Sequence, residues 1–156
     1  MAVNAADGSV LVHGTCVAIS DRGVLLRGAP GSGKSDLALR FISLFGDGKK
    51  PSGRARLVSD DQVLLSRDSR GLVARAPDAI AGKLEVRGVG IVEVDYCAHI
   101  PLAMIADLAS AEEIPRLPPE PQPCEDILGI AVPVLKLNPF ELSSPVKLKL
   151  ALMGRP

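Results

Sequence analysis

Short runs of β-branched and aliphatic residues, separated by turn residues, dominate the hydropathy pattern of this chain. Three turns organise the runs: Asp21-Arg22-Gly23, Asp68–Gly71 and Arg87-Gly88 each lie between two of them and predict hairpins. The pattern therefore indicates a strand-rich protein. The strands predicted are Val10–His13, Thr15–Ser20, Val24–Arg27, Ala55–Ser59, Gln62–Arg67, Leu72–Ala76, Leu84–Val86 and Gly90–Val94.

Helical patterns occupy two places. Asp36–Phe45 is mostly apolar and ends at Gly46-Asp47-Gly48, which predicts a buried helix rather than a cleanly amphipathic one. Lys49–Arg54 follows as a polar loop. Near the other end, Ser143-Ser144-Pro145 has the character of a helix start, so a short helix is expected over Val146–Met153.

The remaining segments are less uniform. Ile100–Ala109 favours a long strand, with a helix as the alternative, and Pro77–Gly82 is a loop or one helical turn. Glu112–Glu125 contains five prolines and is predicted to be an irregular connector. Ile127–Leu137 is a strand pair or one bent strand, in which Pro133 indicates an edge position or a bulge.

The composition excludes several classes of function. The 156 residues carry 18 Lys+Arg and 18 Asp+Glu, so they lack the basic excess that phosphate-backbone binding requires, and we expect no nucleic-acid partner. Residues 1–156 are predicted to form a single domain, with no membrane segment and no signal peptide. The three cysteines, Cys16, Cys97 and Cys124, are expected to be buried thiols of a cytoplasmic protein.

One motif carries specific chemistry. Between the strand Val24–Arg27 and the helix lies a segment that matches G-x-x-x-x-G-K-[ST], the pattern of a phosphate-binding loop. Its glycines allow backbone N–H groups to converge on a phosphate chain, Lys34 reaches the β- and γ-phosphates, and the Ser35 hydroxyl binds Mg²⁺. We therefore expect the phosphates of a nucleotide and Mg²⁺ as ligands. The segment is Gly28-Ala29-Pro30-Gly31-Ser32-Gly33-Lys34-Ser35.

Acidic residues downstream offer partners for this loop. Asp60 and Asp61 follow a predicted strand, and in extended backbone their side chains point to opposite faces, one toward a metal and one toward a substrate. An acidic turn that opens the next hairpin is an equally good interpretation of this segment alone. Glu85 and Arg87 share one face of a strand, either in a role at the site or as a solvated ion pair.

Other candidates are weaker on the residues alone. Asp36 is best explained as an acid that complements the helix dipole. His13 is predicted to lie at the same end of the hairpin as the glycine-rich loop, yet a strand-end histidine without a chemical role is the simpler interpretation. His99 is expected to be structural.

Several classes of phosphate-loop protein are excluded by missing motifs. The base-reading N-K-x-D of GTPases and the Ser-Gly-Gly signature of ABC-type ATPases do not occur, and Asp68–Gly71 fits a hairpin turn better than a GTPase D-x-x-G motif. The arginines are scattered, unlike the helical lid of small nucleotide kinases.

The ordered motifs His13-Gly14, GAPGSGKSD, LVSDD and LEVRGVGIVEV resemble the catalytic domain of bacterial HPr kinase/phosphorylase, from about His13 to Met153. The resemblance implies transfer of phosphate from ATP to a serine of HPr, the carrier protein of the sugar phosphotransferase system. It implies Glu85 as a second magnesium ligand beside Ser35 and Asp60, and Asp61 as the base. His13, Arg87 and Arg116 would join Lys34 in the active site.

The resemblance also implies a homo-oligomer and a short, single-domain form as in alphaproteobacteria. This chain has Pro133–Asn138 where the family often has P-V-R-P-G-R, so the reverse phosphorylase activity is in doubt, since Lys136 does not replace bidentate arginines. Two other functions stay open: a small-molecule kinase or carboxykinase-like enzyme, and an ATP-binding regulatory module without catalysis.

Overall fold

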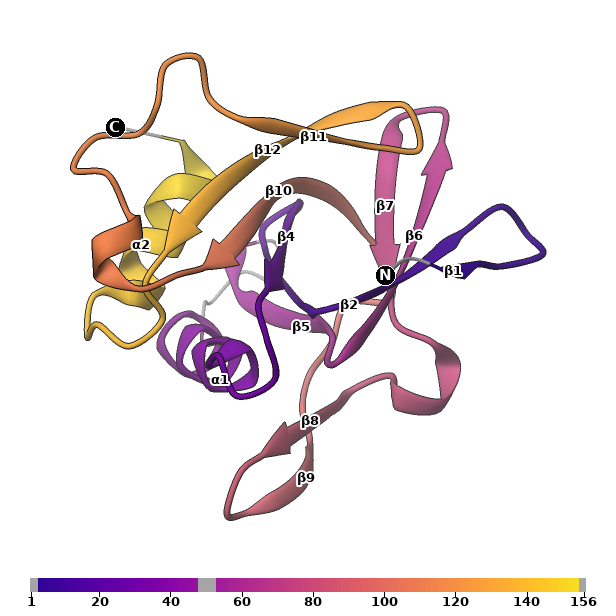
Figure 1. The fold of residues 1–156 in the computed structure, drawn as a ribbon. Coiled ribbons are helices and arrows are strands. Elements are labelled where there is room, and N and C mark those ends of the chain that lie inside the picture. The colour runs from indigo at the N-terminus through magenta and orange to yellow at the C-terminus, as the bar shows by residue number, and fades with distance from the viewer. Residues whose placement is uncertain (1–2, 48–52, 155–156) are drawn as a thin grey trace.

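The computed structural model describes residues 3–47 and 53–154 and has an α/β architecture that is rich in strands (Figure 1). Within this part of the chain, two α-helices accompany twelve strands. The helices are α1 (Lys34–Phe45) and α2 (Ser144–Met153). The strands are β1 (Val3–Asn4), β2 (Val10–His13), β3 (Thr15–Ile19), β4 (Arg22–Arg27), β5 (Ala55–Ser59), β6 (Gln62–Asp68), β7 (Gly71–Arg75), β8 (Lys83–Val86), β9 (Gly90–Glu93), β10 (Ile100–Leu108), β11 (Cys124–Ile127) and β12 (Ile130–Leu137).

Ten strands form one continuous sheet in which β10 is the junction. The main order is β1-β2-β6-β7-β10-β4-β3-β5, and β12 pairs with β10 and carries β11. Ile100 and Pro101 pair antiparallel with β7, whereas the second half of β10 runs parallel to both β4 and β12. The carboxyl ends of these three parallel strands therefore meet at one edge, which is where ligands bind in open α/β sheets.

Alternation along the strands builds two apolar layers. On β4, Val24 and Leu26 face a core that both helices cover with Leu37, Phe41 and Leu148. The neighbouring Leu25 faces a second core, which β2, β6 and β7 close from the other side. The helices lie together on one side of the sheet in Figure 1, and α1 starts beside its ligand edge.

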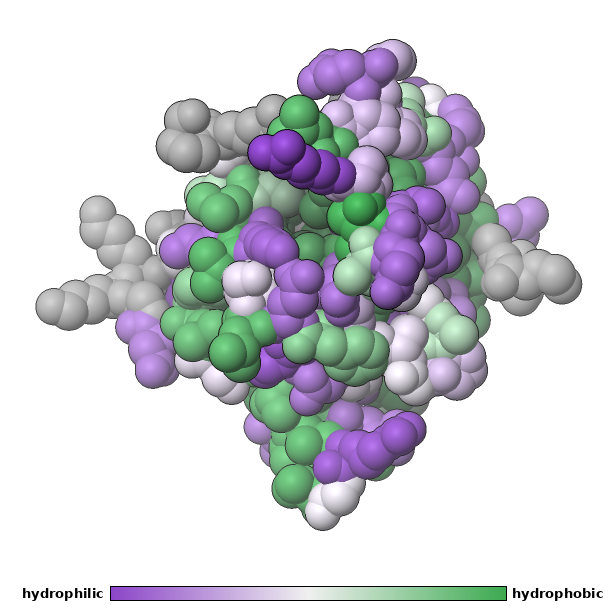
Figure 2. Space-filling model, turned by 60° about the vertical axis from the view of Figure 1, so that its left-hand side comes forward, coloured by the Kyte–Doolittle hydropathy of each residue, from purple (hydrophilic) through white to green (hydrophobic). Residues whose placement is uncertain are grey.

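The hairpin of β8 and β9 projects from the body of the molecule as a separate two-stranded sheet (Figure 1). Its outer part exposes Val89 (74%) and Ile91 (72%). Figure 2 shows this projection at the bottom of the molecule, with hydrophobic and hydrophilic side chains next to one another. At the base of the hairpin Leu84 is buried in the helix-covered core, and Val86 and Val92 pack against that core while partly exposed.

Most predicted strands are confirmed to within one or two residues, but two boundaries were wrong. The first hairpin turns at Ser20-Asp21, so β4 already begins at Arg22, and Ser20 takes a positive φ of 55°. Helix α1 begins at Lys34 rather than Asp36. It is also packed on one face only, because Leu44 is 59% exposed, which corrects the expectation of a buried helix.

The structure decides the segments whose conformation the sequence left ambiguous. Ile100–Leu108 is a strand, Asp78–Ile80 is a 3₁₀ turn, and the second half of the proline-rich connector ends in strand β11. Strand β12 lies between β10 and β11, but at Pro133 itself only β11 is paired, so this residue has one open side, as expected for an edge position. Its missing N–H breaks no bond to β10, since that pairing begins one residue later, at Val134.

Two further expectations concern the cysteines and the polar loop. Cys16 and Cys97 are buried, as predicted, but Cys124 is exposed because it lies at the start of the edge strand β11. Most of the predicted loop Lys49–Arg54 lies outside the described residues. In the described part of the chain, no helix has the length and apolar character to cross a membrane.

Candidate active site

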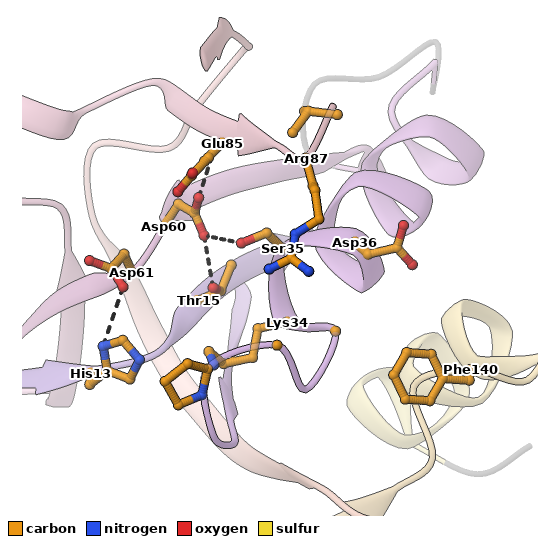
Figure 3. A pocket seen from close by; sticks show the side chains of 14 residues that line it. His13, Thr15, Lys34, Ser35, Asp36, Asp60, Asp61, Glu85, Arg87 and Phe140 are labelled. Carbon is orange, nitrogen blue, oxygen red and sulfur yellow. Dashed lines mark hydrogen bonds and ion pairs between the residues drawn. The ribbon is translucent and has the colours of Figure 1, made fainter. Parts of the chain in front are cut away.

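A hollow of about 540 Å³ opens at the carboxyl end of β4, where the glycine-rich loop leads into α1 (Figure 3). The loop forms its floor, the ends of β2, β3 and β5 form one wall, and the β8–β9 hairpin forms the other. It brings together nearly all of the site residues predicted from the sequence. Those that line it are His13, Pro30, Gly31, Gly33, Lys34, Ser35, Asp60, Asp61, Glu85 and Arg87.

Backbone conformation gives the loop its shape. Gly31 (φ 79°) and Gly33 (φ 95°) are in the left-handed region that other residues avoid, and Gly28 has no room for a Cβ, which would lie 2.4 Å from Ser32 Oγ. Gly33 is the N-cap of α1 and provides no side-chain cap. The first N–H groups of the helix therefore stay available, and together with the helix dipole they suit a phosphate.

Lys34 lies across the loop rather than out in solvent. Its side chain is almost completely buried, and Nζ donates hydrogen bonds to the carbonyl oxygens of Gly28 (2.8 Å) and Ala29 (3.0 Å). These two bonds hold a positive charge at the mouth of the loop. A cation fixed in this position complements the phosphates that the loop amides are shaped to bind.

Asp60 is a buried carboxylate that three donors fix in place. Its Oδ1 accepts hydrogen bonds from Ser35 Oγ (2.8 Å) and Thr15 Oγ1 (2.9 Å), and its Oδ2 accepts one from the Glu85 backbone N–H (3.0 Å). Thr15 is fully buried and Asp60 is 6% exposed. Figure 3 shows these bonds converging on Asp60 from three different elements.

The oxygen donors around Asp60 fit magnesium. A serine hydroxyl and carboxylates are the ligands that Mg²⁺ takes from proteins, usually one or two of them together with phosphate oxygens and water. Residues 3–47 and 53–154 contain no group of three or more His, Cys, Asp or Glu side chains arranged as a metal site. Ser35, Asp60 and Glu85 thus suit an ion that shares its coordination with a nucleotide.

Asp61 points away from Asp60 (Figure 3), but a turn and not the predicted strand alternation is the cause, because β5 ends at Ser59. It has a positive φ of 69°, and the Gln62 N–H bonds back to the Asp60 carbonyl (2.8 Å), which makes a tight three-residue turn centred on Asp61. The Asp61 side chain is 67% exposed, and its Oδ1 lies 3.3 Å from His13 Nδ1. A non-glycine residue in this region of backbone space is strained, and such strain concentrates at functional sites.

Glu85 and Arg87 come from the hairpin and both face the hollow. They form no ion pair with each other in the described part of the chain, which disfavours the simpler interpretation of this segment. In Figure 3 the Arg87 side chain extends from the hairpin toward the glycine-rich loop. A guanidinium here would face the phosphates of a bound nucleotide.

Arg116 is not brought to this hollow. It lines a second hollow, together with Lys136 of β12 and Lys147 of α2. Asp36 pairs with Arg40 one turn along the helix (3.0 Å), as expected for a helix-stabilising acid. The structure therefore separates Arg116 from the other predicted residues.

The sequence interpretation missed two residues of the site, Thr15 and Phe140. Thr15 donates to Asp60, and Phe140, which is 72% exposed, borders the hollow beside Gly33. A polar residue that opens an otherwise apolar strand was a usable signal for Thr15. Phe140 follows Pro139 in a loop and gave no such signal.

Fold and hollow together define a class: α/β proteins whose parallel strand and helix are joined by a glycine-rich anion loop, with acidic side chains opposite. Comparison with known proteins is more specific. The family model described as "HPr Serine kinase C-terminal domain" matches residues 5–138. This chain belongs to that family.

Similar proteins and a solved structure support the same family. The chain is 37% identical over 132 residues to the HPr kinase/phosphorylase of Leptothrix cholodnii, and 33% identical over 133 residues to that of Polaromonas naphthalenivorans. These matches cover 77% and 78% of this chain but only 38% and 39% of the relatives. The solved HPr(Ser) kinase/phosphatase of Coxiella burnetii superposes with a TM-score of 0.73 at 26% identity, covering 89% of this chain and 91% of that one.

Proposed function

We propose that this chain is a protein serine kinase: it transfers the γ-phosphoryl group of ATP to a serine hydroxyl of an HPr-like phosphocarrier protein. The observation that supports this proposal most is that two adjacent carboxylates have different surroundings. Asp60 is buried and tied to Ser35 of the glycine-rich loop, whereas Asp61 is exposed and faces His13. One acid thus serves the nucleotide side of the hollow and the other serves the acceptor side.

On the nucleotide side, the amides of the loop and of the first turn of α1 bind the phosphates, and Lys34 neutralises part of their charge. Ser35 and Asp60, with Glu85 nearby, would hold Mg²⁺, which when bound adds further charge neutralisation. Arg87 approaches the same region from the hairpin. Phosphoryl transfer is accelerated mainly by such positioning and charge stabilisation.

On the acceptor side, Asp61 accepts the proton of the attacking serine hydroxyl. The bond between the γ-phosphorus and the bridging oxygen of ADP breaks as the bond to the serine oxygen forms, so ADP leaves with the electron pair. His13 holds the Asp61 carboxylate at 3.3 Å and orients it toward the acceptor. The exposure of Asp61 supports an acceptor that arrives from solvent, as a serine on the surface of another protein does.

The phosphorylase direction is not part of the proposal. Leu135 and Asn138 stand where related sequences often have arginines, and both line the second hollow rather than the active site. Arg116 lies there too, so its catalytic role stays a prediction. Arg116→Ala tests it, because an unchanged kcat would remove Arg116 from the mechanism.

Assembly into a homo-oligomer is a further part of the proposal, and it rests on the family relationship. The outer side of α2 exposes Val146 (45%), Leu150 (52%) and Met153 (44%), an apolar surface that supports self-association. Light scattering of the purified protein measures the mass: a multimer is expected, and a monomer at all concentrations contradicts this part.

The activity is tested with purified protein, γ-labelled ATP and an HPr-like carrier. Label is expected on a serine of the carrier over many turnovers, and a carrier in which that serine is alanine is the control. Binding of ATP without any transfer would favour the regulatory module. Transfer to a small molecule but not to the carrier would favour the small-molecule kinase.

A further inference from the structure

A three-membered ionic cluster lies at the base of the glycine-rich loop, outside the hollow. Arg27, the last residue of β4, binds Asp107 of β10 through two parallel contacts, from Nε to Oδ1 (2.7 Å) and from Nη2 to Oδ2 (3.0 Å). Its Nη1 binds Glu125 of β11. One guanidinium therefore joins three strands immediately before Gly28.

The geometry of this cluster is more restrictive than that of a surface ion pair. The side chains are half-buried, at 30%, 36% and 44% exposure, and the two-pronged contact to Asp107 fixes the orientation of the guanidinium plane. Hydrogen bonding to Asp107, together with the charges of Asp107 and Glu125, raises the pKa of Arg27 above its ordinary value. Two carboxylates converge on one cation, so removal of Arg27 would leave them to repel each other.

The cluster is directly connected to the loop chemistry. Gly28 and Ala29 follow Arg27 in the chain, and their carbonyl oxygens are the two acceptors that hold Lys34 Nζ. On β10, Leu108 follows Asp107, and its Cβ lies 3.4 Å from the position that a Cβ on Gly28 would take. Any rotation of β4 at Arg27 would therefore move the acceptors of Lys34.

The position of Asp107 adds an electrostatic reason. Asp107 lies at the carboxyl end of a strand parallel to β4 and in register with Arg27, so it is at the ligand edge of the sheet. A free carboxylate near bound phosphates would repel them. Arg27 compensates this charge and leaves Asp60 as the carboxylate that faces the loop.

We propose that Arg27 is a positioning residue for nucleotide binding: held by Asp107 and Glu125, it fixes the Gly28-Ala29 carbonyls that orient Lys34. Arg27 itself does not line the hollow. The inference rests on the proposed nucleotide-binding function of the loop. It predicts an effect on ATP affinity and not on the acid–base step, because Asp61 and His13 lie outside the cluster.

The test measures ATP affinity by isothermal titration calorimetry, at a temperature well below thermal unfolding for every variant. Arg27→Gln is expected to raise the Kd of ATP on the order of tenfold, because displacement of a positioned group is costly even from a distance. Asp107→Asn should give a smaller increase. The double variant should be no worse than Arg27→Gln alone, since the two residues act as one unit.

Arg75→Gln is the matched control, because Arg75 also pairs with an aspartate, Asp7 (3.6 Å), at similar exposure but away from the hollow. Its Kd should stay within twofold of wild type. Arg27→Lys keeps the positive charge between the two carboxylates, so this variant is expected to fold. It loses the two-pronged contact to Asp107 and should therefore bind ATP more weakly than wild type. At saturating ATP, the pH dependence of kcat for Arg27→Lys should match wild type, because Asp61 and His13 lie outside the cluster.

Failure of this inference and failure of the proposed function are distinguishable. If wild-type protein binds no ATP, the proposed function fails. If wild type binds ATP and Arg27→Gln or Arg27→Lys binds it equally well, only the positioning role is overturned. Additive losses in the double variant would also overturn it.

Discussion

Thr15 provides a sensitive test of the way Asp60 is held. Replacing it by valine conserves shape and removes only the hydroxyl that donates to Asp60 Oδ1 at 2.9 Å. Both partners are buried, with Thr15 at 0% and Asp60 at 6% exposure, so water cannot easily replace the lost donor. Ser35 and the Glu85 N–H remain as the other donors.

The magnitude follows from the kind of bond. A hydrogen bond to a charged group contributes about 1.5–3 kcal/mol, and the loss of one partner leaves a buried acceptor under-satisfied. The added methyl group offsets part of this, by up to about 0.8 kcal/mol for one buried carbon. Thr15→Val should therefore lower the free energy of unfolding by roughly 1–2 kcal/mol.

The same variant should weaken the magnesium dependence of ATP binding, because side chains that orient a metal ligand typically account for about 10- to 100-fold in metal affinity. Urea denaturation measures the first effect, and calorimetric ATP titration at graded Mg²⁺ concentrations measures the second. Thr15→Ser keeps the donor and is the control. Unchanged Mg²⁺ dependence in Thr15→Val, or an equal loss in Thr15→Ser, would show that the Thr15 hydroxyl does not position Asp60 for the metal.

Three further outcomes are expected. Lys34→Ala should weaken ATP binding roughly tenfold to hundredfold, since it removes a charge-assisted contact to phosphate; calorimetry showing wild-type affinity would contradict this. Asp61→Gly should raise the free energy of unfolding by about 0.5–1 kcal/mol in urea while abolishing transfer, because glycine accepts the positive φ without strain; a destabilised variant would argue against strain at this position. Iodoacetamide at neutral pH should modify exposed Cys124 and spare Cys16 and Cys97, because both are buried and burial raises the pKa of the Cys16 thiol; peptide mass spectrometry reads the sites, and rapid labelling of Cys16 would contradict its burial.

The parts of the molecule that were predictable from sequence are those fixed by local chemistry. The glycine-rich loop requires positive φ at particular positions, so its residue types and spacing identify it. The hairpin strands are set by alternation and turn residues that lie within a few positions of each other. The acidic pair after the strand Ala55–Ser59 could be picked out from sequence, but its side chains diverge because of the turn at Asp61 and not because of strand alternation.

The parts that were missed depend on contacts between distant segments. Thr15 lies 45 residues from Asp60, and Arg27 lies 80 residues from Asp107 and 98 from Glu125, so no local pattern connects them. Strand β11 begins directly after a proline-rich connector and forms only because β12 pairs with it. The placement of Arg116 depends on the path of that same connector, which its composition does not determine.

The proposed role of Asp61 is tested by comparing wild type with Asp61→Asn in the transfer assay with γ-labelled ATP and an HPr-like carrier. The substitution preserves shape and removes the carboxylate that is to accept the serine proton, while Asp60 and the loop stay intact. Wild type should label a serine of the carrier, and Asp61→Asn should lose transfer by a factor on the order of 100 to 10,000 with its ATP affinity unchanged. Undiminished transfer by Asp61→Asn, or no transfer by wild type that binds ATP, would contradict the account.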